Sequence, residues 1–441
     1  MLTWHVFRLV MVWMAGLFYL QSVATAEGQD DVSVMPRWWG LQVEQRTRSE
    51  WLTAPVRVQG QGASRTLVTQ TRLAFDIRDG LGPFRVGVEL QDARDSYTEG
   101  LFSFPDDQIN KFDILQLRLE IASRRFLGVD LPTRLQLGRL TVDFGSRRLV
   151  ARNVMRNTTN AFDGVLWQLG RSQRWRFHGF ATQPVVISTA RLDASQQGGL
   201  FWGVYFEERF IDRLNLDLYY FGLRDDSRTE PKRSYTTIGG RLYREPIRQT
   251  LDWEMEAVWQ AGRHHGGGHN AFFQHAQLGY TFDTVWETRL SVQYDHASGD
   301  DEPADGRFGR FDTLFGARAF EFSPTGIYGP LSRSNLVSPG LRVTTTPAQR
   351  VGLTGSYRAA WLAEARDGLI GTGLQDPTGL SGRFLGHYLD TRVQVRPIHE
   401  MLVDVGYSRF LKSTYFDTVP FSPGRVPSSY FFAAVSLRLV L

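Results

Sequence analysis

Apolar and polar residues alternate with a period of two along most of the chain. The last stretch reads SSYFFAAVSLRLVL, in which every second residue from Phe431 to Leu441 is apolar. The same period runs through TLDWEMEAVWQ (250–260), DILQLRLEIA (113–122) and FRVGVELQ (84–91). This period is typical of a strand with one apolar and one wet face. No segment shows a convincing helical stripe, so the pattern predicts an all-β chain.

Turn residues divide the alternating pattern into eighteen segments. Gly, Pro, Asn and Asp punctuate the pattern and mark where each strand ends. We therefore predict strands near 38–51, 66–78, 82–92, 112–123, 133–144, 161–170, 175–182, 200–210, 213–224, 234–244, 249–261, 269–282, 286–296, 335–346, 350–363, 384–396, 401–410 and 429–441.

The connections between these segments fall into two alternating sets. One set is short, with only 124–132 longer, and includes 245–248 and 397–400. The other set is long and polar, notably 93–111, 183–199, 297–334, 364–383 and 411–428. Tight turns at one end and long loops at the other are typical of an outer-membrane barrel, with the turns in the periplasm. The predicted fold is a single transmembrane antiparallel β-barrel of about 18 strands.

The strands of a soluble β-sandwich also alternate apolar and polar residues, but that fold gives no reason for short and long connections to alternate along the chain. In a closed barrel the last strand pairs with the first, which explains why the alternation continues to Leu441. Closure is required because an unpaired strand edge finds no water in a bilayer. Aromatic residues near strand ends, such as Trp38, Trp39 and Trp286, suit the two membrane interfaces.

The N-terminus has the features of an export signal. Residues 1–26 hold one basic residue, Arg8, then an apolar run that closes on Ala24-Thr25-Ala26. We predict a signal peptide at 1–26 and the barrel at 27–441; an uncleaved signal anchor is the alternative. The chain has no cysteine, which excludes disulfides and thiolate chemistry. Export without cysteine fits the outer membrane of a Gram-negative bacterium.

Strand parity assigns many charged residues to the wet, lumen-facing side of the strands. Both signs occur, so ion pairs that brace the wall are one interpretation, and rings of arginine that select anions are the other. Of the 50 basic residues, only Lys111, Lys232 and Lys412 are lysine. Such a bias is expected of a GC-rich genome, but guanidinium groups also suit carboxylate binding. The strand residues that we place in the pore lining are Arg72, Arg85, Arg118, Glu120 and Arg358.

The densest basic stretch is LGRLTVDFGSRRLVARNVMRN (137–157). Leu135 and Leu137 would face lipid, and the same parity would send Arg139 outward. We therefore predict a bulge at Gly138 that turns Arg139 into the lumen. We also expect Arg139, Arg148 and Arg152 to lie together at the narrowest part of the channel. A solvated surface loop is the alternative for this cluster.

Four stretches together resemble the family of alginate-export outer-membrane proteins. They are LGRLTVDFGSRRLV, MRNTTNAFDG, YDHASGDDEPADGRFGRFDTLFG and YLDTRVQVRPIHEMLVDVGYSRF, in the same order as in the family. The resemblance implies an eighteen-stranded barrel whose electropositive constriction passes a polyuronate. Ser146 stands where the family tends to have an acidic residue. The residues that match family positions are Arg139, Arg148, Arg152, Arg156, Asn157, Phe162 and Asp163. Of these, we also place Arg139, Arg148, Arg152, Arg156 and Asp163 in the pore lining.

The acidic stretch SGDDEPADG raises the question of a metal. Asp300, Asp301 and Asp305 offer hard oxygen ligands, and part of the spacing resembles a calcium loop over 297–312. Pro303 and Asp312 depart from that pattern, and a solvated acidic loop is the simpler interpretation. No other cofactor is expected.

Two transport functions remain open at this point. The first is export of an anionic polysaccharide, an alginate-like polyuronate, by electrostatically selective diffusion, with periplasmic secretion scaffold proteins as further partners. The second is a porin for uptake of small anionic solutes or oligouronates. An enzymatic or surface-binding barrel is the alternative from another class, but no motif of an enzyme is found. We expect a monomer in contact with outer-membrane lipid and no binding of nucleic acid.

Overall fold

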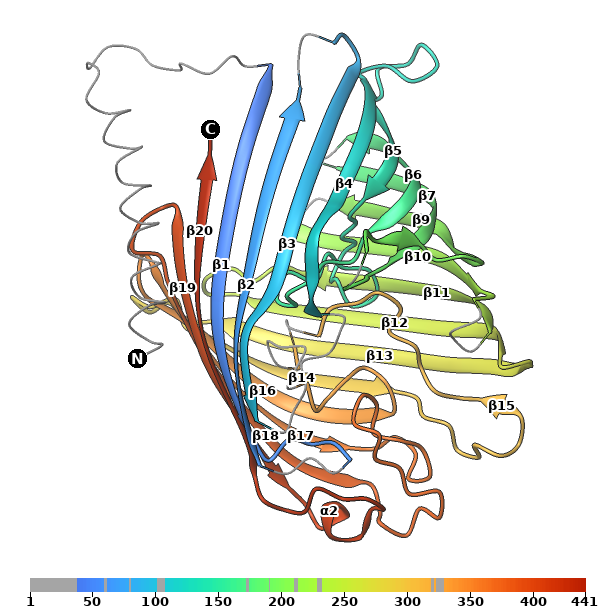
Figure 1. Cartoon of the computed structure of the whole chain (residues 1–441), viewed down its shortest axis with the longest axis vertical. Coiled ribbons are helices and arrows are strands. Elements are labelled where there is room, and N and C mark those ends of the chain that lie inside the picture. Colours follow the sequence, from blue (N-terminus) through green and yellow to red (C-terminus); the bar gives the residue numbers. More distant parts are fainter. Residues whose placement is uncertain are drawn as a thin grey trace. The chain divides into compact units, whose positions relative to one another are not determined.

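Strands make up nearly all of the regular structure in the computed structural model of the chain (Figure 1). The predicted signal peptide at 1–26 lies outside the described residues. Among the residues that are described, no helix has the length and apolarity needed to cross a membrane. The structure describes residues 38–58, 62–78, 81–100, 108–171, 174–189, 191–209, 213–227, 232–318, 321–322 and 329–441.

Twenty strands and one short helix follow one another along the described chain. Two of the strands, β8 and β15, have only two residues each. The elements are β1 (Trp39–Thr53), β2 (Ala63–Ile77), β3 (Phe84–Gly100), β4 (Asn110–Ser123), β5 (Thr133–Leu140), β6 (Phe162–Arg171), β7 (Trp175–Val186), β8 (Ala194–Ser195), β9 (Gly199–Arg209), β10 (Leu214–Asp225), β11 (Arg233–Arg244), β12 (Leu251–His264), β13 (Gly267–Thr281), β14 (Arg289–Ala297), β15 (Arg307–Phe308), β16 (Leu336–Ala348), β17 (Val351–Trp361), β18 (Phe384–Val395), β19 (Met401–Lys412), α2 (Tyr415–Thr418) and β20 (Ser428–Val440).

The eighteen long strands close into an antiparallel barrel. Each pairs with its neighbours in sequence, and β20 pairs with β1 from Gln42 opposite Val440 to Thr53 opposite Ser429. The last strand is therefore part of the wall, as its alternation predicted. All eighteen predicted strands are present, and the predicted fold class is confirmed.

The predicted inner and outer faces are also present. Leu117, Met255 and Trp259 are exposed on the outside. The interleaved Arg118 and Glu254 point inward, where they form ion pairs with other lumen residues. The alternation thus separates a lipid-facing surface from a charged interior.

Several boundaries differ from the sequence prediction, and the differences at three places have a clear cause. β3 continues to Gly100, because its polar residues stay paired with β2 up to Ser64. β5 ends at Leu140 instead of 144, since the chain leaves the wall there. β12 and β13 join through His265 and Gly266 alone, and both have positive φ, as a tight hairpin turn requires.

We expect the connections before and after β18 to lie on opposite sides of the outer membrane. Leu380, in the long loop before β18, is 88% exposed, and Ile398, in the short turn after it, is 44% exposed. Because the chain has no cysteine, Leu380→Cys should react with a membrane-impermeant maleimide on intact cells, whereas Ile398→Cys should react only after lysis. Labelling of Ile398→Cys but not Leu380→Cys on intact cells would invert the topology.

Candidate functional site

Residues 141–161 leave the wall between β5 and β6 and lie inside the barrel (Figure 1). Val142, Phe144, Leu149 and Val150 pack there in an apolar cluster with inward-facing rings of β7, β9 and β10. The ring of Phe144 stacks on Tyr205 with centroids 4.9 Å apart. We call residues 141–161 the inserted segment. Its apolar residues give it a core of its own inside the barrel, so it is a fixed element of the lumen.

The inserted segment interlocks with the long connection between β14 and β16. The amide of Phe315 donates to the carbonyl of Leu149 at 2.9 Å, and the amide of Ala151 donates to the carbonyl of Phe315 at 3.1 Å. The side-chain amide of Asn160 donates to the carbonyls of Ala151 and Phe315, each at 3.0 Å. Two loops that are far apart in sequence therefore form one structural unit in the lumen.

Arg148 clamps the inserted segment to the opposite wall. Its side chain is 4% exposed and contacts Glu254 and Glu256 of β12 and Glu321 of the β14–β16 connection. Burial alone would lower the pKa of the Arg148 guanidinium, but the charges of Glu321, Glu254 and Glu256 raise that pKa well above its usual value. Arg333 pairs with the other oxygen of Glu321. Arg148 is therefore a structural strut with its charge fully compensated.

The other side of the inserted segment is held by β1 and β2. Arg46 donates to the carbonyls of Val154 and Arg156, and Arg48 donates to the carbonyl of Met155. Gln70 donates to the carbonyl of Asn157 at 2.5 Å. These bonds satisfy backbone groups that have no strand partner. Side chains of β1, β2 and β12 thus hold the inserted segment across the lumen.

Many ion pairs inside and at the mouth of the barrel share one arrangement: the arginine faces the water and an acid lies behind it. Eight arginine side chains are 23–46% exposed, and each pairs with at least one carboxylate side chain that is only 0–9% exposed. Arg72 and Arg118 depart from this pattern. We call the eight the front arginines; they are Arg85, Arg134, Arg152, Arg176, Arg209, Arg233, Arg310 and Arg392.

The residues predicted to line the pore fall into different environments. Arg85 and Arg118 are partly exposed on the inner wall, and Glu120 is buried between Arg85 and Arg134. Arg72 is buried and donates to Thr159 of the inserted segment. Arg358 is fully buried, and it pairs with Asp295 and donates to Gln293.

Two of the predicted pore residues, Arg152 and Arg156, lie in the inserted segment and are partly exposed. Arg152 pairs with Glu89 and donates to Thr141 at 3.2 Å. Arg156 donates to the side chain of Asn160 at 2.7 Å and lines a cavity. Arg148 and Arg152 share no ion-pair partner, so the expected basic cluster is divided.

The predicted bulge at Gly138 is wrong. Gly138 has a positive φ, but the register continues through it, with Leu119 opposite Leu137 and Leu117 opposite Arg139. Residues opposite one another share a face, so Arg139 lies on the outer side with Leu117. Asp163, its neighbour on β6, lies on the same side and accepts two hydrogen bonds from Arg139, at 2.8 and 3.0 Å. This partner explains how an arginine is tolerated there, and the predicted place of Asp163 in the pore lining is wrong for the same reason.

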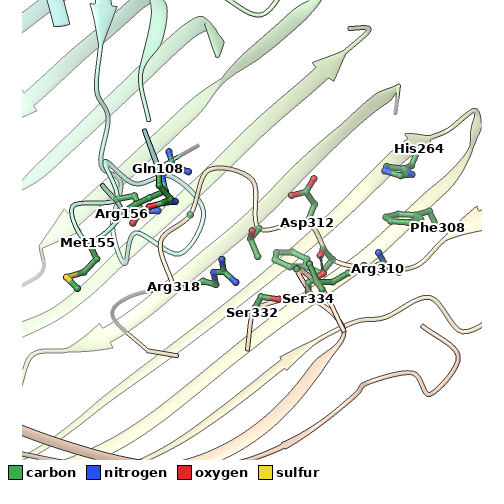
Figure 2. A pocket seen from close by; sticks show the side chains of 16 residues that line it. Gln108, Met155, Arg156, His264, Phe308, Arg310, Asp312, Arg318, Ser332 and Ser334 are labelled. Carbon is green, nitrogen blue, oxygen red and sulfur yellow. Dashed lines mark hydrogen bonds between the residues drawn. The ribbon is translucent and has the colours of Figure 1, made fainter. Parts of the chain in front are cut away.

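A cavity of about 380 Å³ opens at the long-loop end of the lumen (Figure 2). Arg156 and Gln108 lie at one side of it, and Arg318 and Asp312 lie across from them. Hydroxyl groups of Ser332 and Ser334 complete the polar lining. Guanidinium, amide and hydroxyl groups are the donors that recognise carboxylates and sugar hydroxyls.

Sequence reasoning missed Arg310 and Arg318 in this cavity. Both lie in the stretch GRFGRFDTLFGAR, where arginine recurs without strand alternation. Arg310 forms a bidentate pair with the buried Asp367, with Nε 2.8 Å from Oδ2. Arg318 donates to the carbonyl of Gly329 at 3.2 Å. The available signal was the family stretch YDHASGDDEPADGRFGRFDTLFG, which contains Arg310 and ends just before Arg318.

The acids proposed for calcium are not brought together. Asp300 is buried, and the Asp305 carboxylate accepts a hydrogen bond from the amide of Arg307 at 2.7 Å. In the described part of the chain, the one group whose ligand atoms lie within 4.8 Å of one another is His275, Asp295 and Glu321. Arg148, Arg333 and Arg358 already pair with those carboxylates, which disfavours a cation there.

Comparisons with known proteins agree with this architecture. A family model described as "Alginate export" matches residues 37–413. Among solved structures from Pseudomonas aeruginosa, OpdO has a TM-score of 0.61 at 13% identity, over 91% of this chain and 97% of that chain. The outer membrane protein OprD has a TM-score of 0.58 at 11% identity, over 92% and 94%. OpdK with vanillate has a TM-score of 0.59 at 11% identity, over 91% and 99%. A search of curated proteins finds no match.

We expect Arg148→Met to destabilise the barrel strongly. It removes the one cation shared by three lumen carboxylates, and breaking a buried ion pair costs about 3–5 kcal/mol. Arg134→Met is the matched control, because that side chain is 46% exposed and surface pairs contribute about 1 kcal/mol or less. Urea unfolding of the reconstituted barrel measures both. Equal losses in the two variants would show that Arg148 is not a clamp.

Proposed function

The chain belongs to the alginate export family, and on that premise we propose that it passes an alginate-like polyuronate outward through the outer membrane. It is a channel of the Gram-negative outer membrane. The observation that supports an anionic cargo is the arrangement of the front arginines. The role of the protein is electrostatic guidance, with diffusion as the transport step.

The front arginines make the lumen surface positive although acids and bases nearly balance in number. Each guanidinium is closer to a passing solute than the carboxylate behind it, and Coulomb energy falls with distance. A polyuronate carries one carboxylate per sugar, which an arginine can bind through two parallel hydrogen bonds. The acid behind each arginine reduces the net attraction, so the polymer is drawn in without being trapped.

The cavity at the long-loop end extends this path. Arg156, Arg310 and Arg318 provide guanidinium groups there, and Ser332 and Ser334 provide hydroxyl groups. These groups can replace water around the carboxylates and hydroxyls of a sugar as it leaves the lumen. The predicted pore residues Arg85, Arg152 and Arg156 keep their proposed roles, whereas Arg139 and Arg148 do not.

Uptake of small anionic solutes is the second candidate. It is favoured by the likeness to OpdK, whose structure was solved with vanillate, a small carboxylate. A passive channel conducts in both directions, so the property that separates the two candidates is the length of the cargo.

Release of a long labelled polymer tests export directly. Liposomes that contain the protein and are loaded with a fluorescent polyuronate longer than the barrel should release it, because a chain can thread through a charged lumen one sugar at a time. Liposomes without protein control for leakage. Retention of the polymer together with free passage of a monomeric uronate would support the small-solute porin instead.

Neutralising front arginines should shift ion selectivity. We expect the triple variant Arg85→Gln, Arg134→Gln and Arg152→Gln to move the reversal potential towards cations and to weaken block by added polyuronate, since Glu120 and Glu89 are left uncompensated. The matched control replaces Arg171, Arg174 and Arg248 by Gln, because these three side chains are exposed outside the lumen. If both triple variants change selectivity equally, total charge and not position sets the preference.

A further inference from the structure

The wall of the barrel is incomplete between β4 and β7. The pairing of β4 with β5 ends at Leu117 opposite Arg139, although β4 extends seven residues beyond that point, to Asn110. β6 likewise begins at Phe162, opposite Pro184. Beyond Pro184, β7 pairs with the two residues of β8. The departure of the inserted segment therefore leaves a gap in the half of the wall nearer the long loops.

Polar side chains take the place of the missing strand bonds in this gap. Arg139 donates to the carbonyl of Ile114 at 3.2 Å and to the carbonyl of Asp193 at 3.1 Å. The amide of Asp193 donates to Asp113 at 2.5 Å, and Asn110 donates to the Asp193 carboxylate at 2.7 Å. The segment before β8 is thus tied to the open edge of β4.

Ser195 of β8 completes this network from the other side. Its hydroxyl donates to Asp163 at 2.7 Å, and Asp163 also holds Arg139. We call Arg139, Asp163, Asp193, Asp113 and Asn110 the latch. The polar atoms of the latch bond across the gap and tie its two edges together.

On the lipid side of the latch lies a hollow of about 590 Å³. Leu117, Val165 and Leu192 line it, and their exposed fractions are 49%, 37% and 59%. Gly138 and Gly164 face each other in the register and also line the hollow. The hollow lies where the wall is short of strands.

We propose that this hollow binds an acyl chain of an outer-leaflet lipid. The hollow is continuous with the apolar outer face of Leu119 and Leu137, which meets hydrocarbon. Asp113, Arg139, Asp163 and Asp193 also line the hollow, but their polar atoms bond to one another in the latch. Water would compete with those bonds, whereas an acyl chain gains dispersion contacts with the apolar side chains.

The depth of the hollow favours the outer leaflet. Arg139 is six residues from the start of β5, which is about 15 Å along the membrane normal for a strand tilted by about 40°. That is past the middle of an apolar band about 25 Å tall. The inference rests on the outer-membrane location and is independent of the transported cargo.

Photocrosslinking to a diazirine-bearing phospholipid in proteoliposomes tests the proposal. Peptides that contain Leu117, Val165 and Leu192 should be labelled about fourfold more than those around Val292 on β14. That ratio corresponds to the free energy of burying one more methylene group. Val165→Trp should fill the hollow and remove the enrichment at Leu117 and Leu192. Val292→Trp, on the outer face of β14, is the matched control and should leave the enrichment unchanged.

Two outcomes would overturn the proposal. One is uniform labelling around the lipid-facing belt, which would mean that the hollow holds no chain in preference to bulk lipid. The other is reaction of Val165→Cys with a charged, water-soluble thiol reagent in the intact membrane, which would mean that the hollow contains water. Heat-modifiable mobility of each variant checks that the barrel is folded.

Discussion

Backbone hydrogen bonding within a hydrocarbon layer is the constraint on which the rest of this structure depends. A strand edge in lipid has no water to bind, so the sheet must close, and β20 completes the ring by pairing with β1. The constraint is hardest to meet where residues 141–161 leave the wall. Inside the barrel, Arg46, Arg48 and Gln70 satisfy carbonyls of that segment. At the gap that it leaves, Arg139 binds the open carbonyl of Ile114. Arginines of β1 and β5 thus serve the architecture of the wall.

The electrostatic character of the lumen follows from the depth of each charge and not from the net charge. The whole chain carries only +4, and most lumen arginines have an acidic partner. An acid buried behind a guanidinium group fixes the orientation of that group and reduces its attraction for anions. The guanidinium group is still the group that a passing solute contacts first. This arrangement suits a channel, because a cargo must be attracted and also released. The comparison with Arg148 is instructive, since three acids surround that arginine and remove it from the transport path.

Most of the fold could be predicted from the two-residue period, because each strand has one lipid face and one wet face. The same rule assigned Leu117 and Arg118 to opposite sides correctly. The prediction failed for Arg139 because the bulge was inferred to keep a charge out of lipid, whereas the register continues and Asp163 compensates the charge. The burial of Arg148 could not be predicted, since its partner Glu321 is 173 residues away. The predicted strands 249–261 and 269–282 were too short at the turn between them, because two residues with positive φ are enough to reverse the chain.

The central claim is that guanidinium groups form the water-facing layer of the lumen and make it prefer anions. The reversal potential of the unmodified protein in a planar bilayer, measured under a potassium chloride gradient, tests it most directly. The account predicts an anion preference near 0.1 M salt that declines towards 1 M, because the Debye screening length falls from about 10 Å to about 3 Å. A cation preference at low salt, or a preference that does not change with salt, would contradict it.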